Sequence, residues 1–213
     1  MRIEVGDIWE WHDKGHPIVV PVNIGWKKNG ENVMGRGIAK EAALRYPKLA
    51  RSVGDYQCRT YTNGSPGYQT EHSSYWWRDV DSDSPIICLA TKPLNIAQPW
   101  MSWKANSDLK TIHTSVKEFA TQQSVYPNTV FPLLGCGNGG LSPAKVLILM
   151  GGLLATDTIV VVRPEEVDRI PEVYLDNESR TACPVCDELE GNCTGQTSLT
   201  LKGTLDHPIW RGQ

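Results

Sequence analysis

The sequence lacks any apolar run long enough to cross a bilayer, so nothing in it predicts a membrane-spanning helix. It also lacks an excess of positive charge, because 24 Asp and Glu outnumber 21 Lys and Arg and the formal net charge is −3. That balance argues against nonspecific coating of nucleic acid, although it leaves room for one nucleotide in a pocket. Residues 2–5 are typical of a strand and not of a signal peptide, so we expect a cytoplasmic protein.

Phenylalanine is scarce, with two residues against eight tryptophans, and several of these tryptophans stand in polar surroundings. Such a group beside a pocket could stack on a base or a ligand. The tryptophans concerned are Trp76, Trp77, Trp100 and Trp103.

Apolar strand patterns alternate with helical patterns through most of the chain. Strands are predicted at 2–5, 17–24, 85–90, 129–134 and 159–162, and helices begin near Gly37, at Ser107 as the cap and at Pro143. The alternation predicts an α/β fold of three layers, in which helices flank a mixed, largely parallel central sheet. Pro17 and Pro21 indicate that the strand at 17–24 is interrupted or near an edge.

Two polar stretches depart from this alternation. Residues 52–84 predict weak strands or a long surface insertion, and periodicity is lost beyond Pro164. The 213 residues fit one domain with a tail. We therefore expect a domain at 1–165, with a polar insertion at about 52–84, and a C-terminal extension at 166–213.

The loop after the second predicted strand places Gly35 and Gly37 on either side of Arg36, directly before a helix. Glycine lets the backbone approach a ligand closely, and the free N–H groups of a helix start favour phosphate. A tight turn that packs the helix on the strand explains this loop equally well when it is taken alone.

The loop from Gly135 to Gly140 has four glycines in six residues, between a strand and a helix. A flexible hairpin is the less favoured explanation, because such a density indicates a backbone that curls around something. Together the two loops predict a diphosphate held from two sides, at the strand ends where such folds bind ligands. Neither loop has the Walker or the dinucleotide-binding pattern, which disfavours kinase and Rossmann functions.

Four motifs, in order, resemble those of macrodomains. Val5-Gly6-Asp7-Ile8 followed by Val20-Pro21-Val22-Asn23 resembles the macrodomain opening. The other three resemble the branch that contains the DNA ADP-ribosyl glycohydrolase antitoxins and the terminal ADP-ribose glycohydrolase. They are Met34-Gly35-Arg36-Gly37-Ile38-Ala39 as the first phosphate loop, Thr91-Lys92 as the segment with the catalytic lysine, and the run from Pro132 to Leu141 as the second phosphate loop.

The resemblance implies ADP-ribose as the ligand and no required cofactor. Asp7 would accept a hydrogen bond from the adenine amino group with Ile8 alongside, and Asn23 would lie near the distal ribose. Lys92 would attack the anomeric carbon of that ribose or stabilise it electrostatically, and attack requires a lowered pKa. The other implied ligand-binding residues are Met34, Gly35, Arg36, Gly37, Ile38, Thr91, Gly135, Cys136, Gly137, Asn138, Gly139, Gly140 and Leu141.

We therefore expect a hydrolase that removes ADP-ribose from a modified nucleic acid or protein. The alternatives are a phosphatase or deacylase of small ADP-ribose derivatives, and a non-catalytic module that binds ADP-ribose or a related NAD-derived signal. Two departures from the family pattern keep these open. Gly139 stands where the terminal glycohydrolase has an acidic residue, and Ser142-Pro143 replaces the Asp-Trp of the antitoxins.

Metal binding is not predicted, although the tail holds a weak zinc candidate in Cys183, Cys186, Cys193 and His207. The gap to the third cysteine is short and the histidine is an uncertain fourth ligand, so a tail with free thiols is favoured. The acidic run at 79–83 is typical of a solvated loop, with a magnesium site as the alternative. His72 could edge the pocket.

Overall fold

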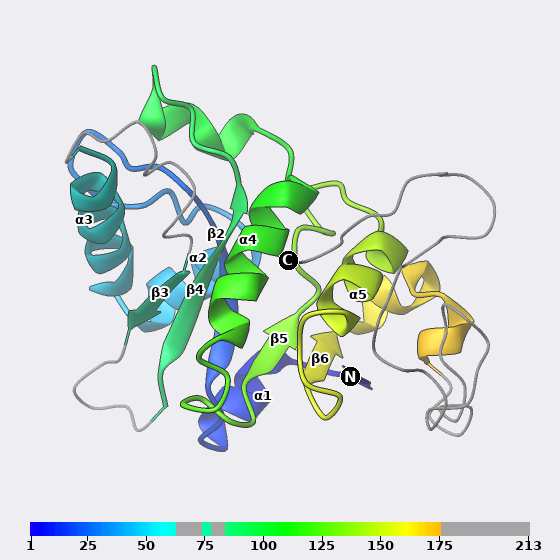
Figure 1. Ribbon diagram of the computed structural model, residues 1–213. Coiled ribbons are helices and arrows are strands. Elements are labelled where there is room, and N and C mark those ends of the chain that lie inside the picture. Colours follow the sequence, from blue (N-terminus) through cyan, green and yellow to red (C-terminus); the bar gives the residue numbers. More distant parts are fainter. Residues whose placement is uncertain (63–73, 78–83, 176–213) are drawn as a thin grey trace. The chain divides into compact units, whose positions relative to one another are not determined.

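The computed structural model describes residues 1–62, 74–77 and 84–175 (Figure 1). The chain separates into one unit at Met1–Ile170 and a second at Pro171–Gln213. In the second unit the described residues form one short 3-10 helix, η3 (Glu172–Tyr174). The cysteines at 183, 186 and 193 and His207, as well as His72 and the acidic run at 79–83, lie outside the described residues.

The first unit is built on a six-stranded sheet in the order β1-β6-β5-β2-β4-β3. All neighbouring strands are parallel except β3, which pairs antiparallel with β4 at one edge. The predicted mixed, largely parallel sheet is therefore confirmed. The strands are β1 (Arg2–Val5), β2 (Ile18–Asn23), β3 (Ser74–Trp77), β4 (Ile86–Lys92), β5 (Val130–Pro132) and β6 (Ile159–Val162).

Helices cover both faces of this sheet. α4 and α5 lie in front of it in Figure 1, whereas α2 lies behind it. Alternate residues of the central strands serve the two faces, since Ile18 and Val20 pack with α1, α2 and α3 while Val19, between them, is buried on the other side. The helices are α1 (Ile8–Asp13), α2 (Gly37–Arg45), α3 (Leu49–Thr62), α4 (Leu109–Ala120) and α5 (Pro143–Gly151), with 3-10 helices η1 (Pro99–Lys104) and η2 (Pro164–Arg169).

Pro21 lies in β2, and Pro17 directly precedes it. Of the two predicted alternatives the edge is wrong, because β2 is central, whereas an interrupted strand agrees with its short pairing to β5. β2 lies between β5 and β4, but its ladder to β5 contains the single pair Ile18–Val130. The sheet therefore opens between β2 and β5 beyond this pair. A proline without an N–H group is tolerated there, because Pro21 follows the point where that ladder has ended.

The interpretation of residues 52–62 as weak strands or an insertion is wrong, because they belong to α3. Leu49 and Val53 are fully buried one helical turn apart, and Gln57 is buried one turn further on. This narrow buried stripe ends in a polar side chain and is surrounded by other polar residues, so the helical period is hard to see in the sequence. The predicted strands in the rest of the stretch are represented by β3 at the sheet edge.

Helix starts agree with the sequence except at one cap. α5 begins at Pro143, as predicted. α4 is capped by Asp108 and not by Ser107, because the Asp108 carboxylate accepts a hydrogen bond from the Thr111 backbone N–H at 2.9 Å. Ser107 instead donates its backbone N–H to the carbonyl of Gly139 at 3.0 Å.

The tryptophans do not form one cluster. Trp77 is buried and packs edge-on against the ring of Tyr46, with 5.2 Å between the ring centroids, so it belongs to the core and not to a ligand surface. Trp100 and Trp103 in η1 are 40% and 44% exposed. No helix among the described residues is both long and apolar enough to cross a membrane.

Candidate functional site

A cavity of about 1170 Å³ opens at the carboxyl ends of the central strands. Asn23 at the end of β2 and Lys92 at the end of β4 contribute to its lining, as does Pro132 at the end of β5. Parallel sheets bind ligands at such strand ends, where neighbouring strands part. The opening between β2 and β5 therefore places the cavity where the topology favours a ligand.

The two glycine loops meet in this cavity. A Cβ built on Gly37 would lie 4.0 Å from the side-chain nitrogen of Asn138, so the first loop faces the second. Of the residues expected at a ligand, Ile8, Asn23, Gly35, Arg36, Gly37, Ile38, Thr91, Lys92, Gly135, Gly137, Asn138 and Gly139 line the cavity. Asp7, Met34, Cys136, Gly140 and Leu141 are not among its lining residues.

The first loop ends in the open start of α2. Gly37 begins that helix with a φ of +55°, a left-handed conformation that favours glycine. The N–H groups of a first helical turn have no partner within the helix, and those from Gly35 to Ile38 donate to no other described backbone group. The loop therefore presents unpaired donors and the positive end of a helix to the cavity.

The second loop is fastened to the protein by its own backbone. Leu141 donates its N–H to the carbonyl of Gly135 at 3.1 Å, and Gly140 donates to Gly137 at 3.2 Å. Gly135 has a φ of +68°, and a Cβ built on it would lie 2.8 Å from the Cβ of Ser107. This loop is thus pressed against the start of α4, and its shape is set before any ligand arrives.

Asn23 lines the cavity and has an unpartnered, buried amide nitrogen. Its side chain is buried, and Nδ2 has no hydrogen-bond partner among the described residues. The backbone carbonyl of Asn23 is held by Asn32 Nδ2 at 2.9 Å and Gln57 Nε2 at 3.2 Å. A buried donor without a partner is costly, which favours a ligand acceptor at this position.

Lys92 lines the cavity, and its ammonium group loses its proton more readily than that of an ordinary lysine. Its burial lowers the pKa of the ammonium group below the usual lysine range. Nζ donates to the backbone carbonyl of Trp103 at 3.0 Å, which holds the side chain in place. Thr91 is turned toward the sheet, since its hydroxyl donates to the Val22 carbonyl at 3.3 Å.

Asp7 has a structural task in this conformation. It caps α1, and one carboxylate oxygen accepts a hydrogen bond from the Trp9 N–H at 3.0 Å. Neighbouring Gly6 and Ile8 line the cavity, so Asp7 stands at its rim. Its hydrogen bond to an adenine amino group stays a prediction.

Sequence reasoning missed the segment that follows β6. Arg163, Glu165, Glu166 and Arg169 from this segment all line the cavity. Arg163 follows directly after the last residue of β6, so the expectation that ligands bind at the strand ends could have found it. The position of Arg169 depends on η2, for which the sequence shows no periodicity.

Arg163 is held by a network that ties the cavity wall to two helices. Its Nη2 donates to both carboxylate oxygens of Glu41 at 2.8 Å, and Trp9 Nε1 donates to the same carboxylate at 2.8 Å. The hydrogen bonds that Arg163 donates to Glu41 raise the pKa of the Arg163 guanidinium. Arg163 therefore carries a positive charge, and its side chain has little freedom to move.

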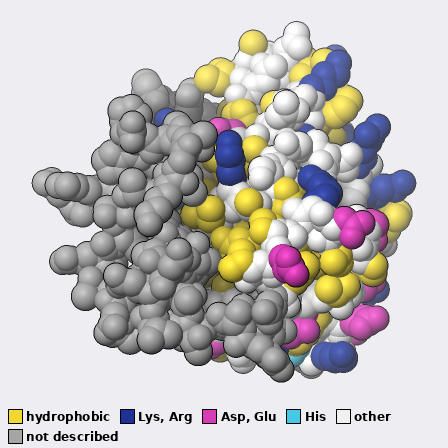
Figure 2. All heavy atoms as spheres, turned by 90° about the vertical axis from the view of Figure 1, so that its right-hand side faces the viewer, with side chains coloured by type: hydrophobic (Ala, Val, Ile, Leu, Met, Phe, Trp, Pro, Cys, Tyr) yellow, Lys and Arg dark blue, Asp and Glu magenta, His cyan; other side chains and the backbone are white. Residues whose placement is uncertain are grey.

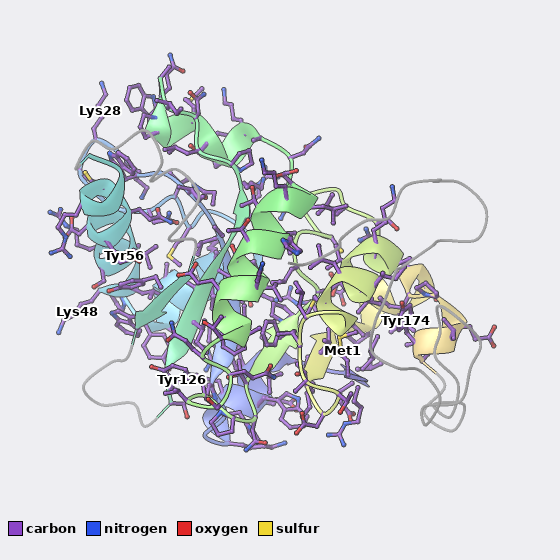
Figure 3. All side chains as sticks on the ribbon, in the orientation of Figure 1. Met1, Lys28, Lys48, Tyr56, Tyr126 and Tyr174 are labelled. Atoms are coloured by element: carbon purple, nitrogen blue, oxygen red, sulfur yellow. The ribbon has the colours of Figure 1, made fainter. Side chains whose placement is uncertain are left out.

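We use the name tryptophan ledge for Trp100, Trp103, Lys28 and Lys104. Lys28 Nζ lies 5.8 Å from the ring centroid of Trp100, and Lys104 Nζ lies 5.7 Å from that of Trp103 (Lys28 is labelled in Figure 3). Trp103 and Lys104 also line the cavity, so the ledge continues its wall outward. Exposed aromatic rings with cations over them suit flat, anionic partners.

Figure 2 shows the face of the molecule that lies on the right-hand side of Figure 1. Positive and negative side chains are interspersed there with hydrophobic ones on its described part. This mixture fits the small net charge of the sequence, and it does not suggest broad binding of nucleic acid on that side.

Neither metal binding nor thiol chemistry is indicated by the described residues. They contain no group of three or more His, Cys, Asp or Glu side chains placed to hold a metal ion. Cys88 and Cys136 are free thiols, and burial raises the pKa of Cys136 to about 12. A thiol so hard to ionise is a poor nucleophile, so Cys136 can serve a ligand only through its backbone.

No protein-family model matches the sequence, and a search of curated proteins finds no match. Solved structures do match it. The macrodomain of Mycobacterium tuberculosis DarG is 25% identical, with a TM-score of 0.55 over 76% of this chain and 96% of that chain. The macrodomain of Thermus aquaticus DarG is 20% identical, with a TM-score of 0.57 over the same shares of 76% and 96%.

A third match contains a ligand. Thermosipho africanus DarTG in complex with ADP-ribose is 21% identical, with a TM-score of 0.58. The alignment covers 82% of this chain but only 46% of that chain, so this chain spans about half of the longer protein. At this level of identity the match supports the assignment of the fold alone.

Proposed function

We propose that this chain, which has the macrodomain fold, binds ADP-ribose and removes it from a modified nucleic acid or protein. The observation that carries the proposal is the meeting of two glycine loops in one cavity that also holds Asn23 and Lys92. The likeness to a DarTG structure in complex with ADP-ribose supports the choice of ligand.

The diphosphate would lie between the two loops. The unpaired N–H groups from Gly35 to Ile38 would donate to it from one side, helped by the positive end of α2. Backbone N–H groups of the second loop would donate from the other side. Two sets of fixed dipoles suit a diphosphate, because the charged ligand exchanges water for donors that need little rearrangement.

The distal ribose would lie between Asn23 and Lys92. The unpartnered Nδ2 of Asn23 would donate to a ribose hydroxyl, which removes the cost of leaving that donor buried and unpaired. The lowered pKa of Lys92 makes a neutral, nucleophilic amine more accessible. Lys92 would attack the anomeric carbon as the bond to the modified group breaks, and water would then displace the lysine and release free ADP-ribose. In the alternative, Lys92 would stabilise the charge that develops at that carbon while water attacks it directly.

The tryptophan ledge favours a nucleic acid strand over a protein as the modified partner. Bases stack on exposed tryptophan rings, and lysines beside those rings meet the phosphates of the strand. Because Trp103 and Lys104 line the cavity as well, a strand on the ledge would stand close to a bound distal ribose.

The test is release of free ADP-ribose from an ADP-ribosylated single-stranded oligonucleotide and from an ADP-ribosylated protein, with ADP-ribose binding measured by calorimetry. Lys92→Ala should abolish release while binding stays within about threefold, because the lysine acts on the bond and the loops hold the ligand. Lys40→Ala, an exposed lysine of α2 outside the cavity lining, is the matched control. Release by the unaltered protein should rise with pH as Lys92 loses its proton.

Each other outcome has a distinct meaning. Unchanged release by Lys92→Ala removes that lysine from the mechanism. Tight binding without turnover of either substrate supports a non-catalytic binding module, and turnover of small ADP-ribose derivatives alone supports a phosphatase or deacylase. No heat on titration with ADP-ribose overturns the proposal.

A further inference from the structure

Four carbonyl groups of the second loop accept hydrogen bonds from protein donors. Those of Gly135, Gly137 and Gly139 accept backbone N–H groups from Leu141, Gly140 and Ser107. The carbonyl of Cys136 differs, because its donor is a side chain: Arg169 Nη2 lies 2.8 Å away. Arg169 is the last residue of η2, so this bond joins the loop to a segment 33 residues further along the chain.

Holding the Cys136 carbonyl also orients the N–H of Gly137. The two groups belong to one peptide unit, and in a planar trans peptide they point in opposite directions. Gly137 lines the cavity, and a Cβ built on it would meet nothing within 4 Å. That N–H donates to no other described backbone group, so it is available to a ligand.

The peptide between Cys136 and Gly137 would turn over easily without this bond. Glycine accepts either sign of φ at little cost, so the following residue offers no resistance to a flip. A flipped peptide would present the carbonyl oxygen to the cavity where the N–H had been. An anionic diphosphate would then meet a partial negative charge and lose a donor.

We propose that Arg169 is a positioning residue whose hydrogen bond to the Cys136 carbonyl keeps the Gly137 N–H facing the ligand's diphosphate. This inference rests on the proposed function for the identity of the ligand. The competing explanation is that Arg169, which lines the cavity itself, contacts the ligand directly with its remaining donors.

The experiment uses the full chain labelled with ¹⁵N-glycine, and follows the Gly137 amide signal by NMR before and after saturation with ADP-ribose. Arg169→Met removes the donor, and Arg169→Lys keeps one. Arg59→Met is the matched control, because Arg59 also donates to a backbone carbonyl, that of Asp55 at 3.2 Å, but lies outside the cavity lining.

In the unaltered protein the Gly137 amide should move downfield on binding, as expected for a donor to phosphate. In Arg169→Met its signal should already differ without ligand, the downfield shift should be lost, and affinity should fall about tenfold to hundredfold, the worth of a hydrogen bond to a charged group. Arg169→Lys should recover much of the shift, and Arg59→Met should match the unaltered protein.

Unchanged affinity in Arg169→Met overturns the proposal. So does reduced affinity with the full Gly137 shift at saturation, because Arg169 would then contact the ligand directly. If the unaltered protein does not bind ADP-ribose, the proposed function fails, yet the Gly137 signal without ligand still shows whether Arg169 orients the peptide. If a thermal melt shows that Arg169→Met is unfolded, the Gly137 amide signal of Arg169→Lys decides whether residue 169 orients the peptide.

Discussion

The two glycine loops face one cavity but are built in opposite ways. The first has few backbone hydrogen bonds. Met34 donates its N–H to the Asn32 carbonyl, and the Arg36 carbonyl accepts the N–H of Lys40. In the second, the carbonyls of Gly135, Cys136, Gly137 and Gly139 are occupied, and the loop is pressed against the start of α4. The first loop thus has freedom to adjust, whereas the second is preorganised.

This difference shows that glycine serves two purposes at one site. Gly135 and Gly139 lack a side chain because Ser107 already occupies the space, so their presence reflects packing. Gly35 and Gly137 have nothing within 4 Å of where a Cβ would stand, so packing does not explain them. Under the proposed function they give a ligand access to the backbone. The glycines of these loops are therefore a mixture of packed and open positions, and the proposed function assigns the open ones to the ligand.

The largest effect should come from Gly139→Ala in the second loop. The added methyl group would collide with the Ser107 hydroxyl and the Gly135 carbonyl. We expect a loss of about 3 kcal/mol in the free energy of unfolding, measured by urea denaturation, because a packed backbone carbonyl has little room to retreat. Ser107→Gly in the same chain should return part of that loss.

Gly137→Ala is the internal comparison for that experiment, because it lies in the same loop with open space around it. Its free energy of unfolding should stay within about 0.5 kcal/mol of the unaltered protein. Equal losses in the two variants would contradict the division of the second loop into packed and open glycines.

An intermediate effect should come from Gly37→Ala in the first loop. Here the reason is conformational, since φ is +55° and the nearest atom to an added Cβ would be Asn138 Nδ2 at 4.0 Å. An alanine in the left-handed region costs about 1 kcal/mol, and asparagine costs less because it visits that region more readily. In urea denaturation the unaltered protein should therefore have the highest free energy of unfolding, followed by Gly37→Asn and then by Gly37→Ala. The reverse order would show that the loop relaxes out of this conformation.

How far the sequence could predict this site depends on the range of the interactions involved. Asn23 and Lys92 were singled out by the resemblance to macrodomains. The cavity edge where both lie could be predicted from the sequence, because the strand ends of a parallel sheet share one edge. The contacts that shape the loops join residues far apart in the sequence. Examples are the hydrogen bond from Arg169 to the Cys136 carbonyl and the close packing of Ser107 against Gly139. These depend on how η2 and α4 dock, which no local pattern reveals.

The fold was easier to predict than its exceptions, for a related reason. Buried parallel strands consist of apolar runs in the sequence, and the predicted bounds of these strands lie within a few residues of the observed ones. α3 was missed because its stripe of Leu49, Val53 and Gln57 ends in an amide. That amide is buried because Gln57 holds the carbonyl of Asn23, so the polar residue that hid the helix also supports the site.

The smallest effect on stability should come from Gly35→Ala, and it is the sharpest test of the comparison. Gly35 does not adopt a left-handed conformation, and no atom lies within 4 Å of the point where a Cβ would stand, so alanine should fit without strain. Since alanine also restricts the unfolded chain, the free energy of unfolding should stay equal or rise by up to about 0.5 kcal/mol. The methyl group would nevertheless keep a diphosphate from the backbone N–H groups, and calorimetry should show ADP-ribose affinity reduced about tenfold. Unchanged affinity would mean that the first loop moves to accommodate the methyl group. Gly35 would then be needed neither for packing nor for access of the ligand to the backbone.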